Sequence, residues 1–453
     1  TFYILPSLNP DAHENFIHKA NTTSSSRSGM MPLDDDGDGL VDEDSYDDLD
    51  GDGHIVNMRR KSPTGRYKID PEFPERMILA KPDEKGEYEL LGFEGIDNDG
   101  DGRVNEDTPG AYDPNRDWGW GWQPDYIQGG ALFYPGSLPE TQNVKKFFYS
   151  HSNIAGAQSY HNFGGMFLRP PGAEEDAMYV PQSDIAVYDV IGKTGEKMIP
   201  GYRYFVLWKD LYTVYGGEID WIGLGRGVFM FSNEINTAYR MFNKNSTENR
   251  NQNVEFEEFD KYLLLGDSYV KWKPFKHPQY GDIEIGGTKK NYIRNTPGFL
   301  LEEEGHRNMA FTMLHAYHMP KIEIVDIKSR ALANGLSEVT ATIQNQRAIP
   351  THSAHDLRFK IERPDYITLK NAQVVAGMIV ENDDLGLTRE QKYNPQTIEV
   401  PNLPGTVGGG FGGGGGPFGG GAGGNAVKVR WIVKGKADKW TVEVDSRKGG
   451  IVS

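Results

Sequence analysis

Aspartates gather in three short stretches near the start of the chain, separated by glycines. The stretches are DDDGDGLVDED at 34–44, DDLDGDG at 47–53 and IDNDGDGRVNED at 96–107. Each contains D-x-D-x-D-G, in which carboxylates at alternate positions converge on one centre while the glycine permits a sharp turn. Oxygen donors arranged in this way favour Ca²⁺. The candidate calcium ligands are Asp34, Asp36, Asp38, Asp42, Asp48, Asp50, Asp52, Asp97, Asp99, Asp101 and Asn105.

The twelfth position of each loop argues against a helix-loop-helix calcium sensor. Such a sensor has glutamate there, whereas this chain has Ser45, Arg59 and Thr108. Repulsion among the carboxylates opposes folding of the region without a cation, so we expect structural Ca²⁺ sites. Weak sites of this kind suit the calcium concentration outside the cytoplasm, which predicts a secreted, periplasmic or cell-surface protein. The alternative is a set of solvated acidic loops.

Two residues farther along the chain could carry hydrolytic chemistry. His161 stands near the end of a predicted strand in SYHNFGG, and Glu234 lies inside the apolar run FMFSNEI. A lone histidine after a strand is more often a packed or hydrogen-bonded residue than a ligand. A buried carboxylate is rarer, because it costs several kcal/mol unless something pairs with it. Glu234 therefore calls for a functional explanation.

Composition excludes several classes of function. The chain has 453 residues, and 48 Lys+Arg against 65 Asp+Glu give a formal net charge of −17. Since phosphate binding needs clustered basic residues, we expect no nucleic-acid partner. No apolar run is long enough to predict a transmembrane span. The absence of cysteine excludes disulfides, thiolate zinc sites and a cysteine nucleophile.

The pattern of elements predicts two domains. Between about 110 and 318, strands such as MFLRP and GVFMFS alternate with helical stretches at 140–151 and 302–319, which indicates an α/β domain. Beyond Pro320, short alternating strands are typical of an all-β, immunoglobulin-like sandwich. These strands are expected at 322–329, 337–346, 357–362, 426–435 and 440–446. The predicted domains are 1–318, with the acidic insert at about 30–108, and 319–453, with a Gly-rich loop at 405–425.

The first residues predict a buried strand. Phe2-Tyr3-Ile4-Leu5 is a β-branched and aromatic run bounded by Pro6 and by the turn at 9–11. The run itself does not have the pattern of a signal peptide. A chain that starts inside a strand leads us to expect that part of the same domain lies upstream of Thr1.

As an ordered series, these stretches resemble the zinc metallocarboxypeptidases of the carboxypeptidase A type. YILPSLNPD is similar to that family's strand before Asn-Pro-Asp-Gly, with Ala12 in place of the glycine. DPNRDW resembles the family's Asp-x-Asn-Arg-Asn motif. PGSLPETQNVKKF resembles the segment that opens the next helix, and SYHN resembles the strand with the third zinc ligand. The spacing between Tyr212 and Glu234 matches that of the family without a gap. The resemblance covers about 1–315 outside the insert and implies a mixed twisted sheet flanked by helices.

The resemblance implies a role for each matching residue. His161 would be a zinc ligand, and Glu234 the general base that takes a proton from metal-bound water. Arg116 and Asn115 would bind the C-terminal carboxylate of a peptide substrate, and Tyr212 would close over it. The arginine that polarises the scissile carbonyl is assigned to Arg27 in preference to Arg59 or Arg60. Ile219 implies a preference for substrates whose C-terminal residue is apolar or aromatic. The neighbouring Glu218 could shift this preference toward a basic or polar residue.

One departure from the family is decisive for activity. The first two zinc ligands come from a His-x-x-Glu motif, which these 453 residues lack. HENFIH at 13–18 has its second histidine one position too late for H-E-x-x-H, and His352 and His355 are expected on the surface of the sandwich. Because zinc needs about three protein ligands, the chain would need the missing N-terminal segment of its domain as a partner.

Three functions remain open at this point. The first is a zinc carboxypeptidase acting on peptides. The second is an inert relative that serves as a surface binding subunit for peptides or glycans, with other cell-surface proteins as possible partners of the sandwich. The third is a peptidase acting on peptidoglycan stem peptides.

Overall fold

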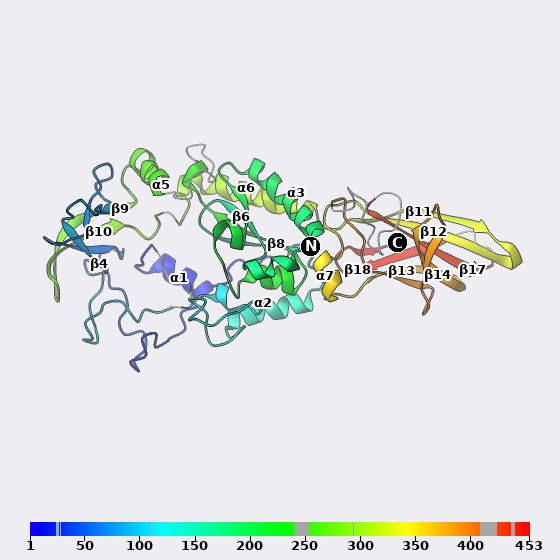
Figure 1. The fold of residues 1–453 in the computed structure, drawn as a ribbon, viewed down its shortest axis with the longest axis horizontal. Coiled ribbons are helices and arrows are strands. Elements are labelled where there is room, and N and C mark those ends of the chain that lie inside the picture. The colour runs from blue at the N-terminus through cyan, green and yellow to red at the C-terminus, as the bar shows by residue number, and fades with distance from the viewer. Residues whose placement is uncertain are drawn as a thin grey trace.

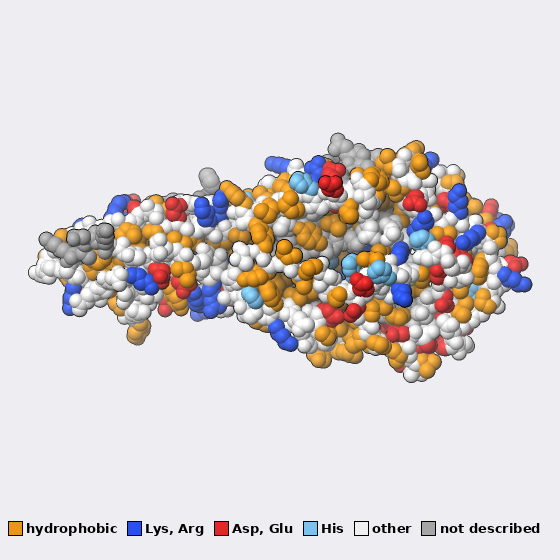
Figure 2. All heavy atoms as spheres, turned by 180° about the vertical axis from the view of Figure 1, so that it is seen from behind, with side chains coloured by type: hydrophobic (Ala, Val, Ile, Leu, Met, Phe, Trp, Pro, Cys, Tyr) orange, Lys and Arg blue, Asp and Glu red, His pale blue; other side chains and the backbone are white. Residues whose placement is uncertain are grey.

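The computed structural model describes residues 1–23, 27, 29–110, 112–240, 253–292, 294–407, 424–435 and 440–453. The molecule is elongated, with a β-rich insert at one end, helices around a small sheet in the middle and a pair of sheets at the other end (Figure 1). Among the described residues, no helix combines the length and the apolar character needed to cross a bilayer. On the face in Figure 2, Lys and Arg side chains are scattered among Asp and Glu, and no broad basic patch is visible.

The central part is built on a mixed four-stranded sheet in the order β5-β8-β6-β7. β5 runs parallel to β8, which is antiparallel to β6, and β6 is parallel to β7. The strands are β5 (Gly156–Asn162), β6 (Met166–Arg169), β7 (Arg203–Val206) and β8 (Phe229–Ile235). The helices are α2 (Pro139–Ser150), α3 (Gln182–Met198), the short α4 (Glu218–Asp220), α5 (Asn253–Phe259) and α6 (Gly298–Tyr317). The predicted mixture of helices and strands is confirmed here, including the helices at 140–151 and 302–319.

Alternation along the strands buries both faces of this sheet. Met230 of β8 faces a cluster with Trp118 and Leu168, whereas Phe231 faces one with Ile191 and Phe311. Successive side chains of a strand point to opposite faces, which explains why an almost continuously apolar run forms β8. α2 covers one face, and α3 and α6 cover the other (Figure 1).

The start of the chain differs from the prediction. Residues 1–9 contain no strand, and α1 (Pro10–His18) follows. The side chains at 2–5 are 44% to 83% exposed, so the buried strand predicted there is wrong. A β-prone run becomes a strand only when another strand binds its backbone groups, and none of the described strands does so. Tyr3 instead packs its ring edge-on against Phe147 and His151 at the end of α2.

The acidic insert contains a sheet that the sequence did not predict. It has six antiparallel strands in the order β3-β2-β4-β1-β10-β9. They are β1 (Asn57–Lys61), β2 (Tyr67–Ile69), β3 (Met77–Leu79), β4 (Tyr88–Phe93), β9 (Tyr269–His277) and β10 (Gly281–Thr288). The last two come from a distant hairpin, and Ile283 and Ile285 of that hairpin pack on Val56 and Met58. The insert is therefore anchored by chain from beyond the central sheet.

The C-terminal part consists of two antiparallel sheets, ordered β11-β12-β17-β14-β15 and β16-β13-β18-β19. The strands of the first are β11 (Ile322–Ala331), β12 (Leu336–Asn345), β14 (Val374–Asn382), β15 (Leu387–Glu390) and β17 (Ala426–Lys434). Those of the second are β13 (Asp365–Lys370), β16 (Thr397–Val400), β18 (Thr441–Ser446) and β19 (Gly450–Val452). Trp431, Ile367 and Val444 lie in their shared core. The Gly-rich loop predicted at 405–425 falls mostly on 408–423, outside the described residues.

The strand predicted at 357–362 is wrong, because helix α7 (Ala354–Phe359) occupies this position. Ser353 caps it by accepting a hydrogen bond from the amide of Asp356. The Asp184 carboxylate of α3 accepts hydrogen bonds from the first two amides of α7, at 2.8 and 3.1 Å. A tertiary contact thus satisfies the helix start and overrides the alternating pattern.

The two histidines predicted on the sandwich surface are buried where α7 meets the central part. His352 and His355 are each 3% exposed. His352 lies between two aspartates, with Nδ1 2.9 Å from Asp356 Oδ2 and Nε2 3.6 Å from Asp365 Oδ1. Burial by itself lowers the pKa of His352, but the two carboxylates outweigh it and raise that pKa to about 9. The histidine therefore serves as a buried cation that joins two acids.

This ion cluster predicts a pH-dependent stability. Because the pKa of His352 is higher in the folded chain, its stabilisation is complete below the unfolded value of about 6.5 and is lost as pH rises through about 9. Urea unfolding of wild type and His352→Asn should show a stability difference that is largest near pH 6 and shrinks toward pH 9.5. The exposed His13→Asn is the control, and a difference that grows with pH would contradict this assignment.

Candidate functional site

A pocket lies at the edge of the central sheet where β5 and β8 end. His161 and Glu234 are direct neighbours in the parallel register of these strands, so both reach the same edge. The hollow opens to solvent. It is lined by Arg27, Asn115, Arg116, His161, Leu168, Leu207, Tyr212, Val214, Gly217, Glu218, Ile219, Ser232 and Glu234. The structure thus brings together every catalytic, substrate-binding and zinc-ligand residue that the sequence suggested.

His161 is held by a carboxylate that the sequence analysis considered only for specificity. Its Nε2 lies 2.7 Å from Oε1 of Glu218, which is 5% exposed. Burial opposes the charged imidazole, but Glu218 and then Glu234 outweigh it and raise the pKa of His161 to about 9. The same pair lowers the pKa of Glu218 against the effect of burial. This carboxylate fixes the imidazole ring and leaves Nδ1 as its second donor atom.

Glu234 lies beside this pair as a second acid. Burial raises its pKa, and the nearby cations His161, Arg27 and Arg294 oppose that rise. A carboxyl group with a raised pKa is a better proton acceptor at neutral pH than an exposed glutamate. The position therefore suits a general base.

Two arginines converge on one carboxylate at the other side of the pocket. Arg27 Nη1 lies 2.8 Å from Asp113 Oδ2, and Arg116 Nη1 lies 3.7 Å from the same oxygen. Arg116 is 7% exposed, and its Nε is buried without a hydrogen-bond partner. Arg116 lines the pocket, so its guanidinium can bind an anion that enters there. Arg59 and Arg60 pair instead with Glu284 and Glu89 in the insert and do not line the pocket.

Paired glycines set the loop that carries Glu218 against the Asn115–Arg116 turn. Gly216 has φ +63°, and a Cβ there would lie 2.7 Å from the carbonyl oxygen of Arg116. That close approach lets the Gly216 carbonyl accept the Trp118 amide at 2.9 Å. Asn115 Oδ1 accepts the amide of Glu218 at 2.8 Å, so Asn115 positions this loop. The resemblance had assigned Asn115 to substrate binding, and this hydrogen bond engages only its side-chain oxygen.

The remaining wall of the pocket is apolar. Leu168, Leu207, Val214 and Ile219 are all buried around it. Tyr212 is 49% exposed at the rim, directly after the π-helical turn Leu207–Leu211. The pocket lining thus combines cationic, acidic and apolar side chains.

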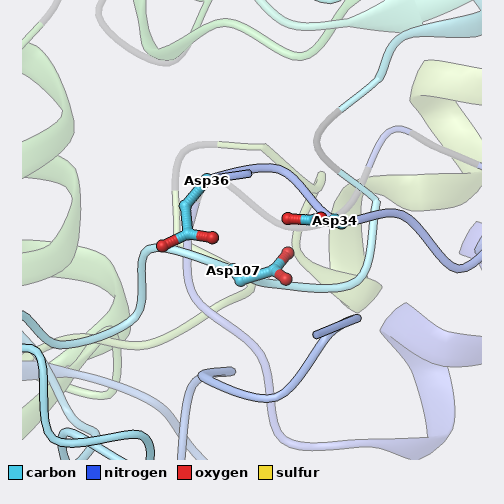
Figure 3. Close-up of side chains that lie close together, drawn as sticks. All are labelled: Asp34, Asp36 and Asp107. Atoms are coloured by element: carbon cyan, nitrogen blue, oxygen red, sulfur yellow. The ribbon is translucent and has the colours of Figure 1, made fainter. Parts of the chain in front are cut away.

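The predicted calcium ligands lie in the insert, apart from this pocket. Carboxylate oxygens converge there in the sets Asp34–Asp36–Asp107, Asp36–Asp38–Glu43, Asp36–Asp101–Glu106, Asp44–Asp97–Asp99 and Asp48–Asp50–Glu94. Figure 3 shows the first of these, where two loops meet. Asp42 belongs to none of the sets and accepts the amide of Leu33, Asn105 donates to the Phe93 carbonyl, and Asp52 lies 3.6 Å from Lys273. Sequence spacing had not indicated Glu43, Asp44, Glu94, Glu106 or Asp107.

The pocket by itself does not provide a zinc site. Within the part of the chain that the structure describes, every set of three or more converging metal-binding side chains lies between 34 and 107. His161 belongs to none of them, and zinc needs about three protein ligands. Any further donors for a metal at His161 would have to come from residues outside those described.

Sequence reasoning missed two residues near the pocket. Asp113, which holds both arginines, was quoted only as part of DPNRDW. Arg294 lies close enough to Glu234 to act on its charge, and its Nε donates to the Thr23 carbonyl at 2.8 Å. Burial and then the neighbouring Arg27 lower the pKa of Arg294. Nothing in its local sequence, NYIRNT, indicates this position.

Comparisons with known proteins divide along the chain. A family model described as a domain of unknown function (DUF8731) matches residues 321–453. No curated protein matches the chain. Among solved structures, a carboxypeptidase A from Helicoverpa armigera is 22% identical over 27% of this chain and 32% of its own, with a TM-score of 0.24. Bovine thrombin-activatable fibrinolysis inhibitor, in complex with tick carboxypeptidase inhibitor, is 14% identical over 49% and 60%, with a TM-score of 0.27.

A further structure of thrombin-activatable fibrinolysis inhibitor is 18% identical over 31% of this chain and 37% of its own, with a TM-score of 0.22. The chain thus spans less than two thirds of the length of each of these three structures. Agreement at these TM-scores does not establish a shared fold.

The turn that carries Arg116 depends on one buried acid, which gives a testable prediction. Asp117 is fully buried and accepts hydrogen bonds from the amides of Gly136, Ser137 and Leu138 and from the hydroxyls of Ser137 and Thr141. Asp117→Ala leaves these donors unpaired, so the free energy of unfolding should fall by about 3 kcal/mol or more. Denaturant unfolding measures this, and the exposed Asp125→Ala should change stability by less than about 0.5 kcal/mol.

Proposed function

We propose that the pocket binds the C-terminal residue of a peptide and forms part of the active site of a metallocarboxypeptidase. The observation that carries this proposal is the convergence of a buried arginine donor, a carboxylate–histidine pair and a second acid around one apolar hollow. An exopeptidase needs a clamp for the terminal carboxylate next to a hydrolytic group.

Arg116 is the clamp for the substrate carboxylate. Its side chain is held by the Asn115 carbonyl at 2.8 Å and by Asp113, so the guanidinium is positioned before any ligand arrives. Arg116 lines the pocket, and a substrate carboxylate there would form a charge-assisted contact with its guanidinium. Arg27, whose side chain is 47% exposed, adds a second positive charge at the rim.

The apolar wall favours an apolar or aromatic terminal side chain. Ile219 is 3% exposed and lies beside Val214, Leu168 and Leu207 in the pocket lining. Glu218 could attract a basic side chain, but its carboxylate already pairs with His161. A lysine or arginine at the peptide terminus would have to compete with that ion pair, which makes the apolar preference the stronger one.

In the proposed hydrolysis, Glu234 and Glu218 have different roles. Glu234 accepts a proton from the attacking water, as its raised pKa favours. Glu218 orients His161 through Nε2. A zinc ion at such a site would supply a Lewis acid, and its other ligands would come from outside the described residues.

We further propose that the protein acts outside the cytoplasm. Three loops rich in aspartate suit an environment outside the cytoplasm, where calcium is abundant.

Peptide binding tests the clamp without requiring activity. A short peptide with a free C-terminal carboxylate and a terminal Phe should bind more tightly than its C-terminal amide, by about tenfold or more, because a charge-assisted hydrogen bond is lost. Arg116→Ala should remove that preference, whereas Arg60→Ala, on the insert surface, should preserve it. Isothermal titration calorimetry measures both, and equal affinity for acid and amide would refute the clamp.

Glu234→Gln tests the hydrolytic part. In a preparation that releases C-terminal residues from peptides, this change should abolish release while leaving peptide affinity within about threefold, because the amide cannot accept the proton. Release is followed by mass spectrometry of the shortened peptide. Peptide binding by wild type without release under any metal supplementation would favour a purely binding role, and undiminished release by the variant would exclude Glu234 as the base.

A further inference from the structure

We propose that the two outer acidic loops form one paired module for divalent cations, in which each loop completes the other's site. The module consists of residues 34–44 and 97–107. Asp107 would join Asp34 and Asp36, and Asp44 would join Asp97 and Asp99, with Ca²⁺ as the cation that these oxygen donors favour. In this arrangement the calcium sites are shared between loops and are not formed by each loop on its own. The proposal does not depend on the proposed peptidase activity.

The two loops are an internal repeat with identical spacing. DDDGDGLVDED and DNDGDGRVNED align without a gap at an offset of 63 residues, so Asp34 corresponds to Asp97 and Asp44 to Asp107. Gly37, Gly39, Gly100 and Gly102 all have positive φ, between 84° and 97°. The same turn therefore forms twice, and each copy ends in an aspartate, Asp44 or Asp107.

When the two loops pair, the last aspartate of each loop lies among the carboxylates of the other loop. Asp44 and Asp107 form an isolated antiparallel bridge. Across this bridge the Asp35 amide donates to Asp107 at 3.3 Å, and in the mirrored contact the Asn98 side chain donates to Asp44 at 3.3 Å. In both directions, the second residue of one loop donates to the last residue of the other. Figure 3 shows the result for Asp107, whose carboxylate lies with those of Asp34 and Asp36.

A buried, unpaired oxygen indicates that a ligand belongs in the module. Asp44 is fully buried, and its Oδ2 has no hydrogen-bond partner. The Asp44 carboxylate nevertheless lies within 4.8 Å of ligand oxygens of both Asp97 and Asp99. Both side-chain oxygens of Glu43 and of Glu106 are also buried without hydrogen-bond partners. Oxygens of this charge that neither water nor a donor reaches are costly, and a bound cation would remove that cost.

The middle loop differs because the protein supplies its counter-charges. Lys273 Nζ lies 2.8 Å from Asp50 and 3.6 Å from Asp52. Both oxygens of Glu94 accept backbone amides, from Leu49 and Val56. The set Asp48–Asp50–Glu94 is therefore partly neutralised without a metal, and it stays outside this proposal.

The module also lies next to the segments that carry the pocket arginines. Asp34 follows Arg27 by seven residues, and Asp107 precedes Asp113 by six. Between them, the Met31 amide donates to the Tyr112 hydroxyl at 3.0 Å. A cation that holds the two loops together would thus keep Arg27 near Asp113, where their 2.8 Å contact lies.

Calcium titration of the full chain tests the exchange of ligands. After treatment with EDTA, isothermal titration with Ca²⁺ alone should show that Asp44→Asn and Asp107→Asn each weaken one site by about tenfold or more. Asp83→Asn, at an exposed position of the same insert, is the control and should bind like wild type. Thermal unfolding in EDTA checks that the variants still fold.

Double substitutions decide which loop each aspartate serves. If Asp44 completes the 97–99 site, adding Asp44→Asn to Asp97→Asn should cost little further affinity, whereas adding it to Asp34→Asn should weaken a second site. The opposite pattern would show that each loop is its own site. Where the buried Asp44→Asn fails to fold, the reciprocal Asp107→Asn takes its place: adding it to Asp34→Asn should cost little further affinity, whereas adding it to Asp97→Asn should weaken a second site. Absence of Ca²⁺ binding by wild type in the micromolar to millimolar range would overturn the module entirely.

Discussion

The parallel pairing of β5 with β8 is the constraint on which the pocket depends. It places His161 and Glu234 side by side at one sheet edge, although 73 residues separate them in the chain. The two aromatic and aliphatic clusters that bury both faces of the sheet hold this register, because a slip by one residue would turn Phe229 and Phe231 to the wrong face. The chemistry of the site therefore depends on apolar residues that never touch a substrate.

Charge compensation explains how so many ionisable groups share one hollow. Glu218 pairs with His161, and Asp113 lies between Arg27 and Arg116. Each carboxylate fixes the orientation of its partner, and Arg27 also acts on the charge of Glu234, so opposite charges in the pocket offset one another. The cost of burying these groups is offset within the pairs, and Glu234 and Arg116 still line the pocket.

In the insert, by contrast, the compensation of charge is incomplete. The carboxylates of its two outer loops lie close together, and hydrogen bonds satisfy them only in part. Its sheet is nevertheless well anchored, because β9 and β10 supply half of its apolar core and Arg59 lies between the rings of Tyr88 and Trp272 at 4.3 and 4.0 Å. Because the sheet beside the loops is firmly anchored, a cation bound by the loops would mainly fix the position of the segments that lead to Arg27 and Arg116.

By itself, the sequence determined the local features: the acidic turns, the apolar run that forms β8, the alternation that forms β17, the helices α2 and α6, and the residue types that line the pocket. Those features depend on neighbours within a few positions. Tertiary structure alone decided that 2–5 is exposed, that α7 replaces a strand, that a distant hairpin completes the insert, and that Glu218 holds His161. Each of these depends on which distant backbone or charged group arrives beside the segment, and local patterns do not carry that information.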